Sequence, residues 1–315
     1  MDDKLILNVA VGPQSVTKDN TARLMLKVLI ALLPTTFWGI WTFGYKALIT
    51  VFVCVLSCVL FEYLYCKFMK LKNTIEDLSA VVTGLLLALN LTSEIPWWIC
   101  IIGSFVAIIM AKQLFGGIGY NFINPALAAR CFLLISFTGR MTEFTYDGLS
   151  SATPLAMMKF KGIDSVDLLQ LFLGNKCGTI GEVSILCLLI GAIFLLVTKV
   201  ITLRIPVSYI LSFSVITFLF GASQFDLKYL LLQIMSGGLI LGAFFMATDY
   251  STSPVTSKGE ILFGIILGVL TALFRGPNAE GVSYAIILGN ILVPLIERVT
   301  IPKYFGQEAS NGRKN

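Results

Sequence analysis

The chain has 315 residues, of which 57% are hydrophobic and only 13% are charged, and its formal net charge is +5. Soluble domains are about 45–50% apolar and about 25% charged, and their core fraction rises only slowly with size, so this composition excludes an ordinary soluble protein. It predicts a polytopic helical membrane protein, whose basic residues collect at cytoplasmic helix ends and do not indicate nucleic-acid binding.

Apolar segments of the length that crosses a bilayer, about 20 residues, recur along the whole chain. Small residues are frequent in them, as is typical of helices that pack closely in lipid. The sequence therefore predicts an all-α integral membrane protein with about ten transmembrane helices. The expected spans are residues 24–43, 46–66, 75–91, 96–115, 122–139, 181–200, 204–221, 228–247, 259–275 and 281–297.

The placement of Lys and Arg indicates an orientation. Basic residues lie before the first span, between the second and third, between the sixth and seventh, and after the last. With ten spans, all of these positions fall on one side of the membrane, so we expect both termini to be cytoplasmic. The long connection at residues 140–180 then lies on the opposite, non-cytoplasmic face.

Two stretches of the sequence resemble each other. Residues 79–96 (SAVVTGLLLALNLTSEIP) align with residues 236–254 (SGGLILGAFFMATDYSTSP), and each is an apolar run that ends in a polar, Pro-terminated break. We expect two inverted five-helix repeats, at 1–139 and 181–315, joined by the connection at 140–180. The breaks at 90–96 and 248–254 would meet near the middle of the membrane.

The connection contains the run TYDGLSSATPLAMMKF at residues 145–160. Thr153 followed by Pro154 is a common helix start, with Thr as the N-cap and Pro at the first helical position. The same geometry favours a phosphate, because free N–H groups and the helix dipole attract anions. The residues alone leave both interpretations open, a helix cap and a phosphate attachment point.

Cysteine and histidine usage limits the chemistry. The chain has no His, and its seven Cys form no C-x-x-C pair. We therefore predict no metal site and no iron–sulfur centre within this chain. Because His, the usual haem and zinc ligand and the usual general base, is missing, a redox role requires an organic cofactor or ligands from a partner.

Two charged residues are expected at membrane depth, Arg130 in the fifth span and Asp249 in the second break. Intramembrane charges are candidates for function, so the two could pair with each other, contact a cofactor or line a cation path. The alternative is that Asp249 caps a turn and that Arg130 reaches out to the interface. A third feature, the Gly-rich run at 116–119, predicts a tight turn between helices, and it follows no strand as a dinucleotide-binding motif would.

The run around Thr153 resembles the flavin-attachment motif of membrane flavoproteins, Asp-x-x-Ser/Thr-Gly-Ala-Thr/Ser, in which the last hydroxyl carries FMN through a phosphoester. Residues 12–34, 121–137, 247–264 and 280–296 resemble the same family, which contains the D subunit of the Rnf electron-transport complex. Its paralogue is the B subunit of the sodium-translocating NADH:quinone oxidoreductase, and the short approach before Arg23 favours the Rnf branch. Ser151 stands where the motif usually has Gly, and Gln14 stands where a His is common.

The resemblance implies an electron-carrying subunit of a translocase that moves electrons between ferredoxin and NAD and couples this to Na⁺ or H⁺ transport. It implies covalent FMN on Thr153 and a non-covalent riboflavin as a second cofactor. From their positions in the sequence, Arg130 is a candidate contact to the flavin, and Asp249 in the second break is a candidate for the ion path. No catalytic residue is assigned, because the chain is not a complete enzyme alone. The motif residues expected at the FMN are Asp147, Gly148, Ser150, Ser151 and Ala152.

The expected partners are the other Rnf subunits in the inner (plasma) membrane, among them a second covalent flavoprotein and iron–sulfur subunits. Ferredoxin and NAD would bind to those partners and not to this chain. Two other classes of function fit inverted five-helix repeats with central breaks, namely a non-redox channel or solute carrier and a structural anchor.

Overall fold

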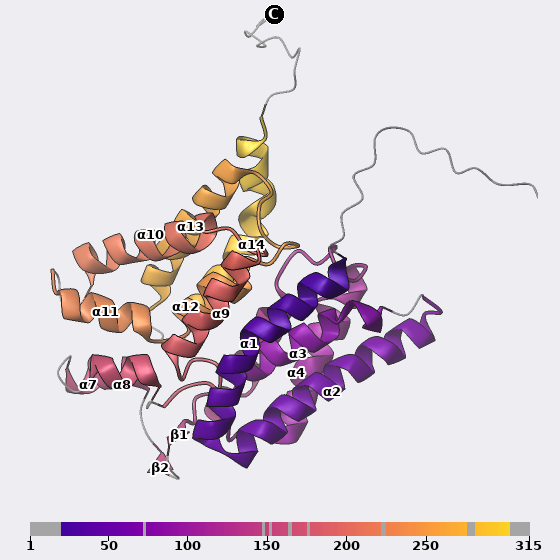
Figure 1. Cartoon of the computed structure of the whole chain (residues 1–315), viewed down its shortest axis with the longest axis horizontal. Helices are drawn as coiled ribbons and strands as arrows, with labels where there is room; N and C mark the ends of the chain where they lie inside the picture. The colour runs from indigo at the N-terminus through magenta and orange to yellow at the C-terminus, as the bar shows by residue number, and fades with distance from the viewer. Residues whose placement is uncertain are drawn as a thin grey trace, which may run out of the picture.

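The computed structural model describes residues 20–71, 74–146, 149–150, 153–162, 166–174, 177–221, 225–275 and 281–302. In these ranges the chain is helical apart from one hairpin and the connections (Figure 1). The α-helices are α1 (Thr21–Phe43), α2 (Tyr45–Phe68), α3 (Ser79–Leu89), α4 (Trp97–Phe105), α5 (Pro125–Ser136), α6 (Thr138–Met141), α7 (Pro154–Lys161), α8 (Leu168–Leu173), α9 (Ile185–Val197), α10 (Arg204–Phe220), α11 (Leu227–Met235), α12 (Leu239–Leu241), α13 (Ser257–Arg275) and α14 (Gly281–Thr300).

Shorter elements also occur in the part of the chain that the structure describes. The 3₁₀ turns η1 (Ile75–Asp77) and η3 (Gln113–Phe115) accompany the five-residue π-helices η2 (Val106–Met110) and η5 (Gly242–Met246). The strands β1 (Thr145–Tyr146) and β2 (Leu149–Ser150) form an antiparallel hairpin in which Thr145 lies opposite Ser150.

The helices confirm the predicted class of all-α membrane protein. Within the described residues, five segments are long and apolar enough to cross a bilayer: Thr21–Phe43, Tyr45–Phe68, Trp97–Phe115, Ser257–Arg275 and Gly281–Thr300. A sixth forms if α11 and α12–η5 count as one span bent by 62°. The apolar helices α3, α5, α9 and α10 are shorter, at 11 to 17 residues. Ten spans, two inverted repeats and the orientation in the membrane stay predictions.

Local chemistry explains where several helices begin. The Asn20 side chain accepts a hydrogen bond from Thr21 N at 2.8 Å and caps α1. Asn124 caps α5 in the same way, and Pro125 occupies the first helical position, where its missing N–H costs nothing. Gly44, with φ +70, makes the turn that separates α1 from α2.

Both predicted breaks are present, and the structure adds a third. The break at 90–96 separates α3, which ends at Leu89, from α4, which begins at Trp97. The break at 248–254 lies between η5 and α13. The expected eighth span, 228–247, is divided, because Gly237 and Gly238 adopt φ values of +63 and +66 and separate α11 from α12.

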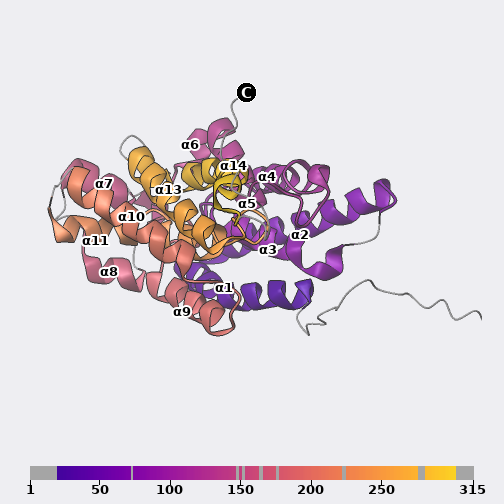
Figure 2. The same cartoon turned by 90° about the horizontal axis from the view of Figure 1, so that it is seen from above.

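Figures 1 and 2 place α2, α3 and α4 on one side of the molecule and α10, α11 and α13 on the other, with α14 between them. Helix α3 lies in the core, where nearly all of its residues are buried. Close approach depends on small residues: a Cβ on Gly268 of α13 would lie only 1.8 Å from Ser212 Oγ of α10.

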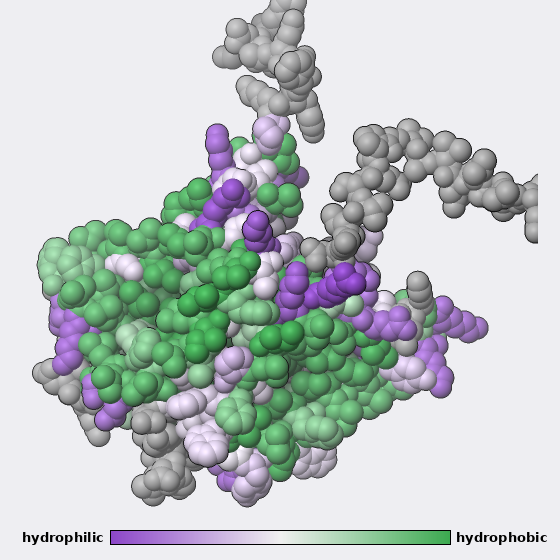
Figure 3. All heavy atoms as spheres, viewed as in Figure 1, coloured by the Kyte–Doolittle hydropathy of each residue, from purple (hydrophilic) through white to green (hydrophobic). Residues whose placement is uncertain are grey.

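The surface separates into apolar flanks and polar ends. Figure 3 shows hydrophobic side chains over the flanks and many hydrophilic ones near the start of α1 and the end of α14. Phe37 of α1 and Phe52 of α2 are 68% and 64% exposed, which suits residues that face lipid.

Candidate functional site

Thr153 begins α7, as the sequence predicts. Its backbone is extended, Pro154 follows at the first helical position, and Thr153 Oγ1 accepts a hydrogen bond from Ala156 N at 3.3 Å. The side chain is half-buried. The hydroxyl oxygen therefore sits at the N-terminus of an eight-residue helix, where N–H groups and the helix dipole favour an anion.

The rest of the motif is described only in part. Ser150 ends the β1–β2 hairpin just before Thr153, and the structure gives its backbone position. Four motif residues lie outside the described part of the chain, so their predicted role at a flavin stays a prediction. These are Asp147, Gly148, Ser151 and Ala152.

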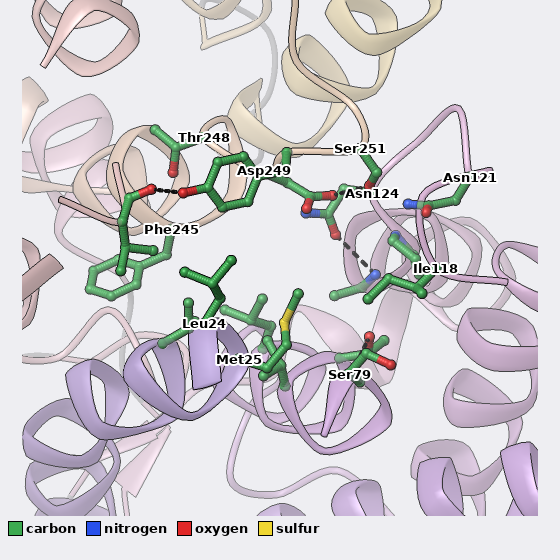
Figure 4. Close-up of a pocket in the computed structure, with 18 of the residues that line it drawn as sticks. Leu24, Met25, Ser79, Ile118, Asn121, Asn124, Phe245, Thr248, Asp249 and Ser251 are labelled. Atoms are coloured by element: carbon green, nitrogen blue, oxygen red, sulfur yellow. Dashed lines mark hydrogen bonds between the residues drawn. The ribbon is translucent and has the colours of Figure 1, made fainter. Parts of the chain in front are cut away.

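A second candidate site is a pair of adjoining cavities of about 690 Å³ and about 90 Å³ near the start of α1. The smaller one is walled by α1, α3, α5, η5 and the segment that follows η5. In Figure 4, Leu24 and Met25 of α1 face the cavity from one side, and Thr248, Asp249 and Ser251 face it from the other.

Asp249 lies in the wall shared by both cavities. Its Oδ2 accepts hydrogen bonds from Ser251 Oγ at 3.0 Å and from Thr252 Oγ1 at 3.3 Å. The two predicted roles are compatible, because Asp249 caps its own turn and also presents a carboxylate to the cavity.

The Gly-rich run forms the predicted tight turn. Gly116, Gly117 and Gly119 have φ values of +113, +91 and +87, which only Gly adopts readily. This turn connects η3 to α5 and brings Ile118 and Asn121 into the wall of the cavity.

Arg130 is buried and does not extend to the surface, so the alternative in which it reaches out to the interface is excluded. Its side chain is 5% exposed. One guanidinium nitrogen donates to Asn90 Oδ1 at 2.6 Å, and another lies 3.6 Å from Glu182 Oε1. The ionic contact of Arg130 is thus with Glu182, while Asp249 is held by its own turn.

Sequence reasoning missed a buried ion pair. Lys112 Nζ donates to Glu62 Oε2 and to Ser79 Oγ, both at 2.7 Å, and Thr74 Oγ1 donates to Glu62 Oε1 at 2.6 Å. The Lys112 and Glu62 side chains are 3% and 0% exposed. The available signal was a lone charge in each of two long apolar runs, at 47–66 and 96–115.

The two candidate sites lie at opposite ends of the molecule. Figure 1 shows α7 and the hairpin at one end, and the start of α1, which lines the cavity, at the other. Among the described residues, no group of three or more Cys, Asp or Glu is placed to hold a metal ion. One end of the molecule therefore offers the Thr153 hydroxyl for covalent attachment, and the other offers a cavity with both apolar and polar side chains in its wall.

Comparison with known proteins gives a consistent result. Residues 8–306 match the model of the NQR2, RnfD, RnfE family. The chain is 45% identical to the D subunit of the Na⁺-translocating ferredoxin:NAD⁺ oxidoreductase complex of Acetobacterium woodii, over 96% of each chain. It is 36% identical to the proton-translocating counterpart of Clostridium ljungdahlii, over 96% of this chain and 97% of that one. The D subunit of an ion-translocating oxidoreductase complex of Stutzerimonas stutzeri is 37% identical over 93% and 94%.

Proposed function

This chain belongs to the NQR2, RnfD, RnfE family, and from that premise we propose that it is the D subunit of an Rnf complex that relays electrons through FMN on Thr153. The complex is an ion-translocating ferredoxin:NAD oxidoreductase, as the names of the relatives from Acetobacterium woodii and Clostridium ljungdahlii state for those proteins. The chain acts as one membrane subunit of this enzyme, together with partner subunits that bind ferredoxin and NAD.

The observation that carries the proposal is the position of the Thr153 hydroxyl at the start of α7. A phosphoester on Oγ1 would place its charged oxygens beside the first N–H groups of the helix, including that of Ala156. The half-buried side chain leaves room on one side for a modifying enzyme and for a large ring. These features fit FMN held through its phosphate.

Bound FMN supplies one-electron and two-electron transfer, and the chain supplies its position. Thr153 anchors the phosphate, Pro154 sets the direction in which α7 begins, and the hairpin leads the chain into this start. We expect Thr153 to face the outer side of the membrane and both termini to be cytoplasmic.

The cavity at the opposite end suits the second, non-covalent flavin. Its larger part, of about 690 Å³, lies within the range of about 300–1,000 Å³ that is usual for ligand sites. The wall of this larger part combines apolar side chains such as Leu24 and Ile118 with the amides of Asn121 and Asn290. Such a wall suits riboflavin, which has a flat apolar ring system and a polar ribityl chain.

Asp249 is our candidate for the ion path. Its carboxylate lines the same cavity, and it provides an anionic oxygen that holds Na⁺ or a proton. A cation there would offset negative charge arriving nearby in a low dielectric. Replacing Asp249 by Asn, with electron flow and Na⁺ uptake both measured, tests this role, and unchanged coupling removes Asp249 from the path.

Fluorescence in a denaturing gel tests the central proposal. Wild-type chain should fluoresce under ultraviolet light, Thr153→Ser should retain the signal because the hydroxyl remains, and Thr153→Ala should be dark. A dark wild-type band from cells able to attach flavin would overturn the redox role and leave a transporter or an anchor. Flavin released by denaturation, but absent from the gel band, reports the second site separately.

The B-type subunit of a sodium-translocating NADH:quinone oxidoreductase is the alternative within the same family. The purified complex distinguishes the two, because an Rnf complex reduces NAD with reduced ferredoxin, whereas the alternative oxidises NADH with a quinone.

A further inference from the structure

The three helix breaks in the described part of the chain include the one after α3 and the one between α11 and α12. Backbone groups released by such breaks must find new partners, because lipid offers none. The hydrogen bonds and ionic contacts that stabilise the first break are joined to those that stabilise the second.

The first break is held by the segment at 177–184 and by Arg130. Ile180 N donates to Leu91 O at 3.0 Å, and Gly181 N donates to Leu89 O at 2.7 Å. Arg130 donates to the Asn90 side chain at 2.6 Å. The released carbonyls are thus paired with backbone from a segment about 90 residues further along the chain.

The second break is held by charged side chains. Arg275 donates to Ser236 O at 2.6 Å and to Gly237 O at 3.1 Å. Gly238, the N-cap of α12, lies against the Glu182 carboxylate so closely that a Cβ on Gly238 would be 2.5 Å from Glu182 Oε1. An anion at a helix N-terminus is favourable, so Glu182 stabilises the start of α12 and η5.

The ion pair between Arg130 and Glu182 joins these two arrangements. The guanidinium lies 3.6 Å from the carboxylate, and the two side chains are 5% and 11% exposed. A continuous chain of contacts therefore runs from Asn90 through Arg130 and Glu182 to Gly238.

The elements joined in this way are also walls of the cavity near Asp249. Leu86 of α3, Asn124 at the start of α5 and Phe245 of η5 all line it. Neither Arg130 nor Glu182 is among its lining residues. The ion pair therefore contacts the elements that form the wall, but it does not line the cavity itself.

We propose that Arg130 and Glu182 are positioning residues, whose ion pair sets the spacing of the two broken helices and so the shape of the cavity. A test of this proposal by riboflavin binding rests on the proposed flavin site, whereas a test by hydrogen exchange in the two breaks does not. The competing explanation is that the pair contributes only to stability.

The experiment compares Glu182→Gln, the double variant Arg130→Gln/Glu182→Gln and the control Glu143→Gln in the complete, solubilised complex. The control removes one partner of the exposed Arg140–Glu143 pair, whose N–O distance is 3.3 Å and which lies outside both breaks. Three quantities are measured: the thermal midpoint, hydrogen exchange of peptides that cover 89–92, 180–181 and 238–246, and the Kd for added riboflavin.

We expect Glu182→Gln to lower the midpoint, to speed exchange in both breaks, and to weaken riboflavin binding by about tenfold or more, since a loss of about 1.4 kcal/mol corresponds to tenfold. The double variant should recover much of the midpoint, because it leaves no buried charge unpaired. Exchange and riboflavin binding should stay impaired, because two Gln side chains do not restore the connection.

Full recovery of all three quantities in the double variant would show a role in stability alone and overturn the proposal. A Glu182→Gln variant that behaves like Glu143→Gln would overturn it as well. If the wild-type complex does not bind riboflavin, the proposed flavin site fails, and the exchange rates in the two breaks alone decide the positioning role.

Discussion

Replacing Lys112 by Met should destabilise the protein strongly, because it leaves a carboxylate in the interior without its cation. The Glu62 side chain is 0% exposed, and its Oε2 lies 2.7 Å from Lys112 Nζ, which balances its charge. After the change, Thr74 still donates to Glu62 at 2.6 Å, but a hydroxyl cannot neutralise a buried charge.

Breaking a buried pair by removing one partner costs about 3–5 kcal/mol. With about 2 °C lost per kcal/mol for a protein of this size, we expect the thermal midpoint to fall by about 6–10 °C. The double variant Glu62→Gln/Lys112→Met removes both charges, so it should recover most of this loss.

Thermal unfolding of the solubilised complex measures the effect. Lys46→Met is the matched control, because Lys46 binds Glu94 at the same 2.7 Å, but on the surface, where water and salt screen the pair. We expect no measurable shift in the control. Equal shifts in Lys112→Met and Lys46→Met, or no recovery in the double variant, would show that the burial argument is wrong.

Two further predictions concern packing and a buried hydroxyl pair. Gly191→Val should lower the thermal midpoint, because its Cβ would lie 2.1 Å from a carbonyl oxygen of α1, whereas Gly139→Ala, with nothing within 4 Å, should leave it unchanged. Tyr209→Phe should cost about 1–3 kcal/mol in chemical denaturation, since Thr271 loses its 2.6 Å partner while fully buried.

Apolar periodicity and breakers predicted the helices well. Helices α1 and α2 and the break at 90–96 lie within a few residues of the expected bounds, because long apolar runs and Pro determine them locally. The division at 236–238 was missed, although two adjacent Gly residues signal it, because the surrounding run is apolar enough to suggest one span.

Candidate residues within one short motif could be predicted, whereas contacts between segments far apart in the sequence could not. Thr153 is a helix start by its own neighbours, so its place could be predicted. The partner of Arg130 is 52 positions away, and that of Lys112 is 50 positions away, and no local pattern shows which charges meet. Pairing at that separation depends on how the broken helices cross.

Each of the π-helices η2 and η5 contains one residue more than an α-helical turn would. This extra residue sets the direction in which the side chains beyond it point. Lys112 comes two residues after η2, and Asp249 comes three residues after η5. A π-turn amounts to a one-residue insertion in an α-helix, and one residue corresponds to about 100° around the helix axis. Deleting a single residue from either π-turn would turn Lys112 away from Glu62, or Asp249 away from the cavity, with every chemical group still in the chain.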